Sequence, residues 1–206
     1  MAAPDQPQLS FDLKTKRPTG NRRVTPPTRQ RVYFAIRPEP QAALAAAGLG
    51  QAVYARHRLA GNLYTPERLH ISLCAVDWVV ELREDIVFAA MQAAAQIEMP
   101  GFSVCFDRIS PFNDGDTGAV VLRCSDGDMA LRDLAAALFT AMRDLGWQPP
   151  HRRNFTPHMT LYRGRHAAPE SRLIRPIRWH VEDFVLVHSG GGRQDNVSRW
   201  PLSPPA

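Results

Sequence analysis

The sequence predicts an α+β fold in which antiparallel strands lie inside and helices lie outside. Segments with alternating apolar and polar residues, typical of strands, are separated by segments whose apolar residues recur at helical spacing. The order strand, helix, polar-faced strand, helix occurs roughly twice along the 206 residues. A chain of this length is able to bury a sizeable core in one compact unit.

The N-terminal residues 1–30 form a polar, proline-rich tail ahead of the folded part. They hold six basic and two acidic residues, which is +4 of the net charge of +5. Because so few apolar side chains cannot offset the entropy lost on ordering, we predict that the tail is disordered; an arm that guides RNA is the functional alternative. The remaining residues 31–206, which we predict to be a single domain, carry only about +1. The overall pI therefore says little about a nucleic-acid-binding face on the folded part.

The first half of residues 31–206 predicts two strands and two helices. Residues 31–37 are β-branched and aromatic and end at prolines, as strands do. Residues 40–58 are rich in alanine and predict a helix. A second strand covers residues 68–73, and residues 82–97 predict an amphipathic helix with acidic residues in its first turn.

The second half repeats this plan. Residues 102–109 and 118–124 predict two strands of a hairpin, because the loop between them is rich in Asn, Asp and Gly. Residues 131–145 predict a helix that a left-handed glycine ends. After a second polar-faced strand at residues 155–163, further strands are expected at 181–187 and 197–202, joined by a triple-glycine turn.

Two of these strands each carry a histidine and a small hydroxyl two residues apart. They are His70 with Ser72, and His158 with Thr160. Side chains alternate across a strand, so each pair shares a polar face while the residues between them are apolar; by the same rule Tyr162 joins the polar face of the second strand. A histidine next to a surface hydroxyl is common by chance, but two such pairs in alternating strands favour a shared catalytic groove over isolated structural histidines.

Two histidines and two hydroxyls suit displacement at phosphorus. One neutral imidazole takes a proton from water while a protonated imidazole gives one to the leaving oxygen. The hydroxyls donate hydrogen bonds to the non-bridging oxygens, where negative charge grows in the transition state. This chemistry requires no metal and no cofactor.

The two motifs resemble those of the 2H phosphoesterase superfamily, and within it the RNA 2′,3′-cyclic phosphodiesterases that are also known as 2′-5′ RNA ligases. The resemblance extends from about Arg31 to Leu202. It includes Arg-Val-Tyr-Phe-Ala-Ile at residues 31–36, Leu-His-Ile-Ser-Leu at 69–73 and Pro-His-Met-Thr-Leu-Tyr-Arg at 157–163. It implies two pseudo-symmetric lobes whose antiparallel sheets form a central cleft, with the helices outside. Ser72 departs from the threonine that is commoner in the family, but it keeps the hydroxyl donor.

The resemblance also implies residue roles. His158 is expected to be the general base for the attacking water, and His70 the general acid for the departing 3′ oxygen. Arg163 is expected to contact the substrate phosphate, although on a regular strand it faces away from the cleft unless a bulge re-aims it. Phe34 in the opening strand is expected to stack on a nucleotide base.

The implied function is metal-independent hydrolysis of RNA 2′,3′-cyclic phosphate ends to 2′-phosphates by a cytoplasmic monomer. The alternatives are an RNA-end or nucleotide phosphate-binding module without turnover, a 2′-5′ RNA ligase, and a small cyclic nucleotide phosphodiesterase. The three cysteines lack CxxC spacing, which favours a reducing compartment. No apolar run approaches the roughly 18 residues of a membrane span, so no membrane partner is expected.

Overall fold

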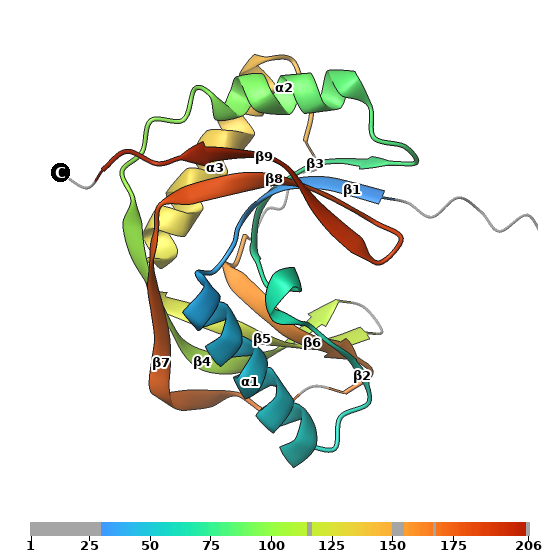
Figure 1. The fold of residues 1–206 in the computed structure, drawn as a ribbon, viewed down its shortest axis with the longest axis vertical. Coiled ribbons are helices and arrows are strands. Elements are labelled where there is room, and N and C mark those ends of the chain that lie inside the picture. Colours follow the sequence, from blue (N-terminus) through green and yellow to red (C-terminus); the bar gives the residue numbers. More distant parts are fainter. Residues whose placement is uncertain (1–29, 115–116, 150–154, 167, 205–206) are drawn as a thin grey trace, which may run out of the picture.

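The structure of the protein is a computed structural model, shown in Figure 1, that describes residues 30–114, 117–149, 155–166 and 168–204. The tail that is predicted to be disordered lies outside the described residues except for Gln30, which opens the first strand. The helices are α1 (Pro40–Arg56), α2 (Glu84–Ala94), α3 (Asp128–Asp144) and a short 3-10 helix, η1 (Pro66–Arg68). The strands are β1 (Gln30–Ile36), β2 (Gly61–Leu63), β3 (Ile71–Val79), β4 (Phe102–Asp114), β5 (Thr117–Asp126), β6 (His158–Gly164), β7 (Ser171–Val181), β8 (Asp183–Gly190) and β9 (Arg193–Pro201).

The nine strands of the described residues form one hydrogen-bonded sheet. Its order is β7-β4-β5-β6-β3-β1-β8-β9, with β2 added to β6. The paired strands are antiparallel throughout these residues. Between β6 and β3 the register contains a single pair, Ile71 opposite Met159. The sheet therefore has a four-stranded half (β3-β1-β8-β9) and a five-stranded half (β7-β4-β5-β6 with β2), the upper and lower lobes of Figure 1, which meet at one point.

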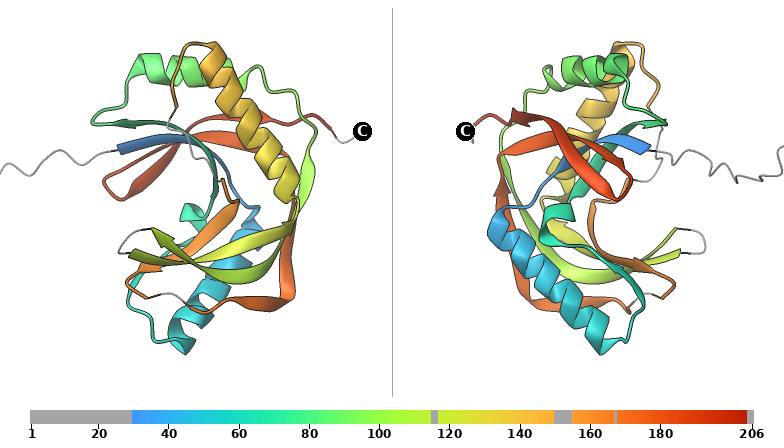
Figure 2. Two further views of the ribbon diagram at one scale, coloured as in Figure 1. Left: turned by 180° about the vertical axis from the view of Figure 1, so that it is seen from behind. Right: turned by 45° about the vertical axis from the view of Figure 1, so that its right-hand side comes forward.

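The helices cover the two halves in a crossed arrangement (Figures 1 and 2). Helix α1 follows β1 of one half but packs against β6 and β7 of the other. Helix α3 follows β5 but packs against β3 and against α2. Because each half of the sheet is covered by a helix that the other half of the chain supplies, neither half is able to bury its apolar face alone.

One hydrophobic cluster fills the space between the sheet and the helices. Phe34 of β1, Leu122 of β5, Leu134 of α3 and Met159 of β6 all belong to it and have no exposed surface. A smaller cluster on the opposite face of the sheet holds four buried side chains, Tyr33, Ala35, Val185 and Val187. The alternation of β1 thus separates a core face from a second face, which carries the motif residues.

The predicted α+β architecture with outer helices is confirmed. Helix α1 ends two residues before the predicted boundary, because Arg58 adopts a left-handed φ of 48° that a helix cannot continue through. Helix α3 ends as predicted, with Gly146 at a φ of 80°. The glycine turn between β8 and β9 is also confirmed, since Gly191 and Gly192 both have positive φ.

The predictions failed for part of the C-terminal region. Strand β7 was not predicted, since its first residues are mostly exposed and Pro176 interrupts them; only Ile177, Trp179 and Val181 show the alternation of a half-buried strand. The strand predicted at residues 181–187 is instead divided, because β7 ends at Val181 and β8 begins two residues later.

No helix in the described part of the chain is both long enough and apolar enough to pass through a membrane.

Candidate active site

The single pair between the two halves of the sheet brings both motifs together. Ile71 lies opposite Met159, and both side chains are fully buried on the core face. Neighbouring residues on a strand point to the opposite face. The strand predicted at residues 68–73 begins later, at Ile71, because Arg68 ends the short helix η1, so His70 lies directly before β3. His70, whose ring lies against Tyr33, and Ser72 share that second face with His158 and Thr160, which flank Met159.

Both motif strands contain a β-bulge directly after the hydroxyl residue. In β3, Ser72 pairs with Ala35 and Cys74 pairs with Phe34, so Leu73 has no partner of its own. Leu73 and Cys74 are both buried in the core cluster. The extra residue shifts the alternation by one position, so the next residue, Ala75, returns to the face of Ser72.

The bulge in β6 re-aims Arg163. Thr160 pairs with Val121 and Tyr162 pairs with Val120, which leaves Leu161 as the extra residue. Leu161 and Tyr162 both lie on the core face, each 1% exposed. Arg163 therefore returns to the face of Thr160 although it follows it by three residues. The expectation that Tyr162 shares the motif face is wrong: its ring packs edge-on against Tyr54 of α1, and its hydroxyl donates to the Ala60 carbonyl oxygen at 2.8 Å.

The two imidazoles are held in the same way. His70 Nδ1 lies 2.8 Å from the Arg68 carbonyl oxygen, and His158 Nδ1 lies 2.7 Å from the Thr156 carbonyl oxygen. A carbonyl oxygen only accepts, so each Nδ1 carries the proton and donates it. The neutral ring then has its lone pair at Nε2, and the protonated ring has a second N–H there. Each histidine thus presents Nε2 as a base or as an acid.

An aromatic ring lies against each histidine. The Tyr33 ring of β1 is 5.3 Å from the His70 ring, tilted by 38°, and the Phe112 ring of β4 is 4.5 Å from the His158 ring at 22°. Such ring pairs contribute roughly 0.5–1.5 kcal/mol beyond the area they bury. Together with the Nδ1 hydrogen bond, each ring restricts the orientation of its imidazole.

The electrostatics of the site favour neutral His70 when no substrate is bound. Burial lowers the pKa of His70 to about 4, and the positive charges of Arg37, His158 and Arg68 add to this, while the hydrogen bond to the Arg68 carbonyl opposes it. Burial likewise raises the pKa of Tyr33 to about 12, which keeps its hydroxyl protonated at neutral pH. The action of the His158 charge on His70 places both histidines in one electrostatic site.

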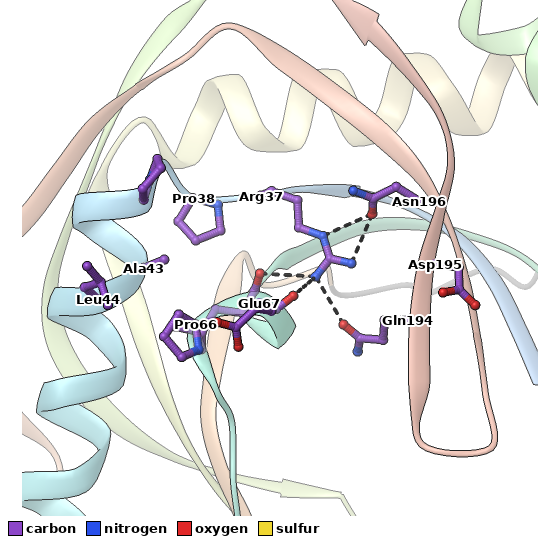
Figure 3. Close-up of a pocket in the computed structure, with 11 residues that line it drawn as sticks. Arg37, Pro38, Ala43, Leu44, Pro66, Glu67, Gln194, Asp195 and Asn196 are labelled. Carbon is purple, nitrogen blue, oxygen red and sulfur yellow. Dashed lines mark hydrogen bonds between the residues drawn. The ribbon is translucent and has the colours of Figure 1, made fainter.

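Arg37 of the β1–α1 connection braces the segment that leads into His70. Its guanidinium donates to the carbonyl oxygens of Glu67 at 3.1 Å and Leu69 at 3.4 Å, and to the side-chain oxygens of Gln194 and Asn196 in β9. Figure 3 shows these contacts in a pocket of about 640 Å³ between α1, η1 and β9. Neither motif histidine lines this pocket, so it adjoins the motif face rather than containing the two imidazoles.

A family model that matches most of the chain identifies the family of this protein. The family model described as the 2′-5′ RNA ligase superfamily matches residues 27–193. The chain belongs to this superfamily. The predicted membership of the LigT-like 2H phosphoesterases is thereby confirmed. No curated protein matches this sequence.

Solved structures share the fold of this superfamily member. E. coli LigT in its apo form is 25% identical with a TM-score of 0.66, and the alignment covers 85% of this chain and 99% of LigT. LigT complexed with 3′-AMP is 24% identical with a TM-score of 0.66, over 84% of this chain and 98% of LigT. TT0787 of Thermus thermophilus is 18% identical with a TM-score of 0.69, over 85% of this chain and 100% of TT0787. The predicted bilobal 2H phosphoesterase fold is confirmed.

One residue role that the superfamily resemblance implies is contradicted by the geometry. Phe34 has no exposed surface and packs against Phe184 and Trp200 in the core, so its ring offers no face to a nucleotide base. The aromatic side chain of β1 on the motif face is its neighbour Tyr33. Strand alternation shows in advance that only one of the two rings reaches that face, but not which one.

Sequence reasoning about this superfamily member also missed Phe112 and Arg37. Phe112 lies 46 residues before His158, and only the pairing of β4, β5 and β6 brings their rings together. Arg37 follows Ala35 by two residues, so strand alternation alone was a usable signal for its place on the motif face. Within the described residues there is no group of three or more His, Cys, Asp and Glu side chains able to hold a metal ion.

Proposed function

We propose that this protein is an enzyme that hydrolyses RNA 2′,3′-cyclic phosphate ends to 2′-phosphates by general acid–base catalysis with its own side chains. The observation that carries the proposal is the register of β3 and β6, which brings His70, Ser72, His158 and Thr160 to one face, with both imidazoles held through Nδ1. Support comes from the family match and from solved structures of LigT with nucleotides, including 3′-AMP and ATP.

In the proposed reaction His158 Nε2 takes a proton from water while the water oxygen attacks phosphorus. The bond from phosphorus to the 3′ oxygen breaks, and His70 Nε2–H gives its proton to that oxygen, which leaves a 2′-phosphate. The hydroxyls of Ser72 and Thr160 donate to the non-bridging oxygens as their charge grows. Arg163, re-aimed by the bulge, adds a positive charge beside the same oxygens.

The acid role of His70 depends on the substrate. With a pKa of about 4 the free His70 imidazole is neutral at pH 7 and has no second proton to give. A phosphodiester monoanion about 4 Å away stabilises the imidazolium by roughly 4 kcal/mol at an effective dielectric constant of about 20, or about three pKa units. Binding of the substrate anion is thus sufficient to bring the pKa of His70 close to neutrality.

The test is incubation of the protein with a 2′,3′-cyclic mononucleotide in excess EDTA, with the phosphate position of the product determined by NMR. We expect the 2′-phosphate as the product. The double variant His70→Ala/His158→Ala, purified in parallel, should not form it at a detectable rate. A 3′-phosphate product would show that the 2′ oxygen is the leaving group instead of the 3′ oxygen. Tight binding of the nucleotide without turnover identifies a phosphate-binding module instead.

The family description favours one second candidate, 2′-5′ RNA ligation. Here a 5′-hydroxyl of RNA replaces water as the nucleophile, and the same base and acid act on it. Adding an RNA with a free 5′-hydroxyl to the assay, and separating the products on a gel, distinguishes a 2′-5′-linked product from the hydrolysed end.

A further inference from the structure

Cross-strand pairing places three arginines in line with His158. Arg123 of β5 lies opposite His158 of β6, Arg108 of β4 lies opposite Arg123, and Arg172 of β7 lies opposite Arg108. Residues directly opposite in an antiparallel pair project from the same face. The three arginines, named here the arginine row, therefore run across the lower half of the sheet on the motif face and end at the catalytic histidine.

The neighbours of the arginine row support this orientation. Ile109 and Leu122, which flank Arg108 and Arg123 along their strands, are buried in the core cluster and pair with each other. The arginines therefore point away from the core. Arg108 and Arg123 are half-buried, and Arg172, which is farthest from His158 along the row, is exposed.

Positive charge in the arginine row is only partly compensated. Among the ion pairs of the described residues, only Arg108 takes part, with Asp107 at 3.5 Å. Like charges directly opposite each other on a sheet destabilise the fold. A bound polyanion removes this repulsion, because each phosphate then lies between neighbouring guanidinium groups.

The facing half of the site is chemically different. On the motif face of β1 and β8 the buried side chains Tyr33, Ala35, Val185 and Val187 form an apolar cluster without a charged member. The arginine row thus adds positive charge on the β6 side of the histidines, while on the other side Arg37 and Arg68 act on His70. The net charge of about +1 for residues 31–206 hides this distribution.

A 2′,3′-cyclic phosphate is by definition a 3′ end, so the rest of such an RNA extends from the site only in the 5′ direction. Neighbouring strands are about 4.8 Å apart, so the arginine row reaches about 14 Å from His158. A ligand that contacts Arg172 therefore extends beyond its terminal nucleotide.

We propose that the arginine row binds backbone phosphates on the 5′ side of the reacting end, so the preferred substrate is an oligonucleotide rather than a mononucleotide. This inference rests on the proposed function for the nature of the end group. It adds Arg172 and Arg108 as specificity-determining residues that do not touch the reacting atoms.

The test measures equilibrium binding by fluorescence anisotropy, so it does not depend on turnover. The probes are a 5′-labelled pentanucleotide and a labelled mononucleotide, each ending in a 2′-phosphate, at 50 and 200 mM salt. For wild type we expect tighter binding of the pentanucleotide and a stronger salt dependence. Arg172→Gln is expected to weaken pentanucleotide binding roughly three- to fivefold and to reduce its log–log salt slope by about 0.7, with mononucleotide binding unchanged.

Arg56→Gln is the matched control, because Arg56 is also exposed but lies in the last turn of α1, which covers the core face. It is expected to leave both probes unaffected. Three results would each contradict phosphate binding by the arginine row. They are equal effects of the Arg56 and Arg172 variants, an equal loss of affinity for both probes, and no preference of wild type for the pentanucleotide. Failure of wild type to hydrolyse cyclic ends, with the Arg172 effect intact, rejects the proposed reaction alone.

Discussion

The two motif strands start alike and then diverge. Each begins at a histidine, His158 as the first residue of β6 and His70 directly before β3, whose Nδ1 is bonded to a carbonyl two residues earlier. A hydroxyl follows two residues later, and a bulge comes after it. At the position that the bulge re-aims, β3 carries Ala75 and β6 carries Arg163. The local fold is thus repeated, while the charge is not.

In the proposed reaction, this difference lets a symmetric frame support asymmetric chemistry. A base and an acid need similar rings in similar positions, which the repeated hydrogen bond and bulge provide. On the β6 side positive charge comes from Arg163 and from Arg123, which lies opposite His158. On the other side β3 carries Ala75, and the charges that act on His70 come from Arg37 and Arg68 outside the strand.

The largest expected effect distinguishes the two histidines. His70→Ala and His158→Ala should each lower turnover of a cyclic phosphate by roughly 10²–10⁴-fold. With a substrate whose 3′ oxygen is replaced by sulfur, the leaving thiolate needs little protonation, so His70→Ala should recover substantially while His158→Ala stays impaired.

Steady-state rates with both substrates measure this effect, and thermal melts of both variants check that the fold is intact. Rescue of His158→Ala instead of His70→Ala reverses the acid and base roles. Equal behaviour of the two variants means that the roles are not divided between the strands.

The next effect concerns the position after each bulge. Arg163→Gln should lower kcat/KM by roughly 10- to 100-fold, because a charged hydrogen bond contributes about 1.5–3 kcal/mol. The matched change in the other strand, Ala75→Ser, should alter kcat/KM less than twofold. Steady-state kinetics of both variants on one cyclic mononucleotide measure this difference. Similar losses of kcat/KM for the two variants would show that the two bulges place equivalent groups.

The aromatic rings should have smaller effects. Phe112→Leu and Tyr33→Leu remove the ring that lies against each histidine and should each lower kcat by about 2- to 10-fold at the pH optimum. Tyr33→Phe keeps the ring and should retain most of the activity. A loss in Tyr33→Phe as large as that in Tyr33→Leu would instead assign the role to the hydroxyl. Since these are positioning residues, the width of the pH–rate profile is the second readout.

The last expected effect is on stability rather than on rate. The pKa of His70 is about 4 in the folded protein and about 6.5 in an unfolded chain. Between these values the unfolded chain binds a proton that the folded chain does not, so the free energy of unfolding falls as the pH falls from about 6.5 to about 4. In urea titrations at pH 7 and pH 4.5, His70→Ala should lose less stability between the two pH values than wild type does. An identical loss would contradict the depressed pKa.

Much of this protein was readable from its sequence, because alternation and turn chemistry act over a few residues. The polar faces of the segments around His70 and His158, the helices, the pairing of β4 with β5 and the Gly-Gly-Gly turn all follow from such local rules. The prediction for Arg163 also named the condition on which it depended, a bulge. That bulge was not predictable, since it shows only in how β6 pairs with β5.

Tertiary structure decided what depends on partners far away in the chain. Whether Tyr33 or Phe34 faces the site depends on which side of β1 the core packs, and that in turn depends on helices from the other half of the chain. The contact of Phe112 with His158 and the arginine row across β7, β4 and β5 exist only through strand register. Register is set by the packing of the whole core, because a shift of one residue exchanges the two faces of a strand.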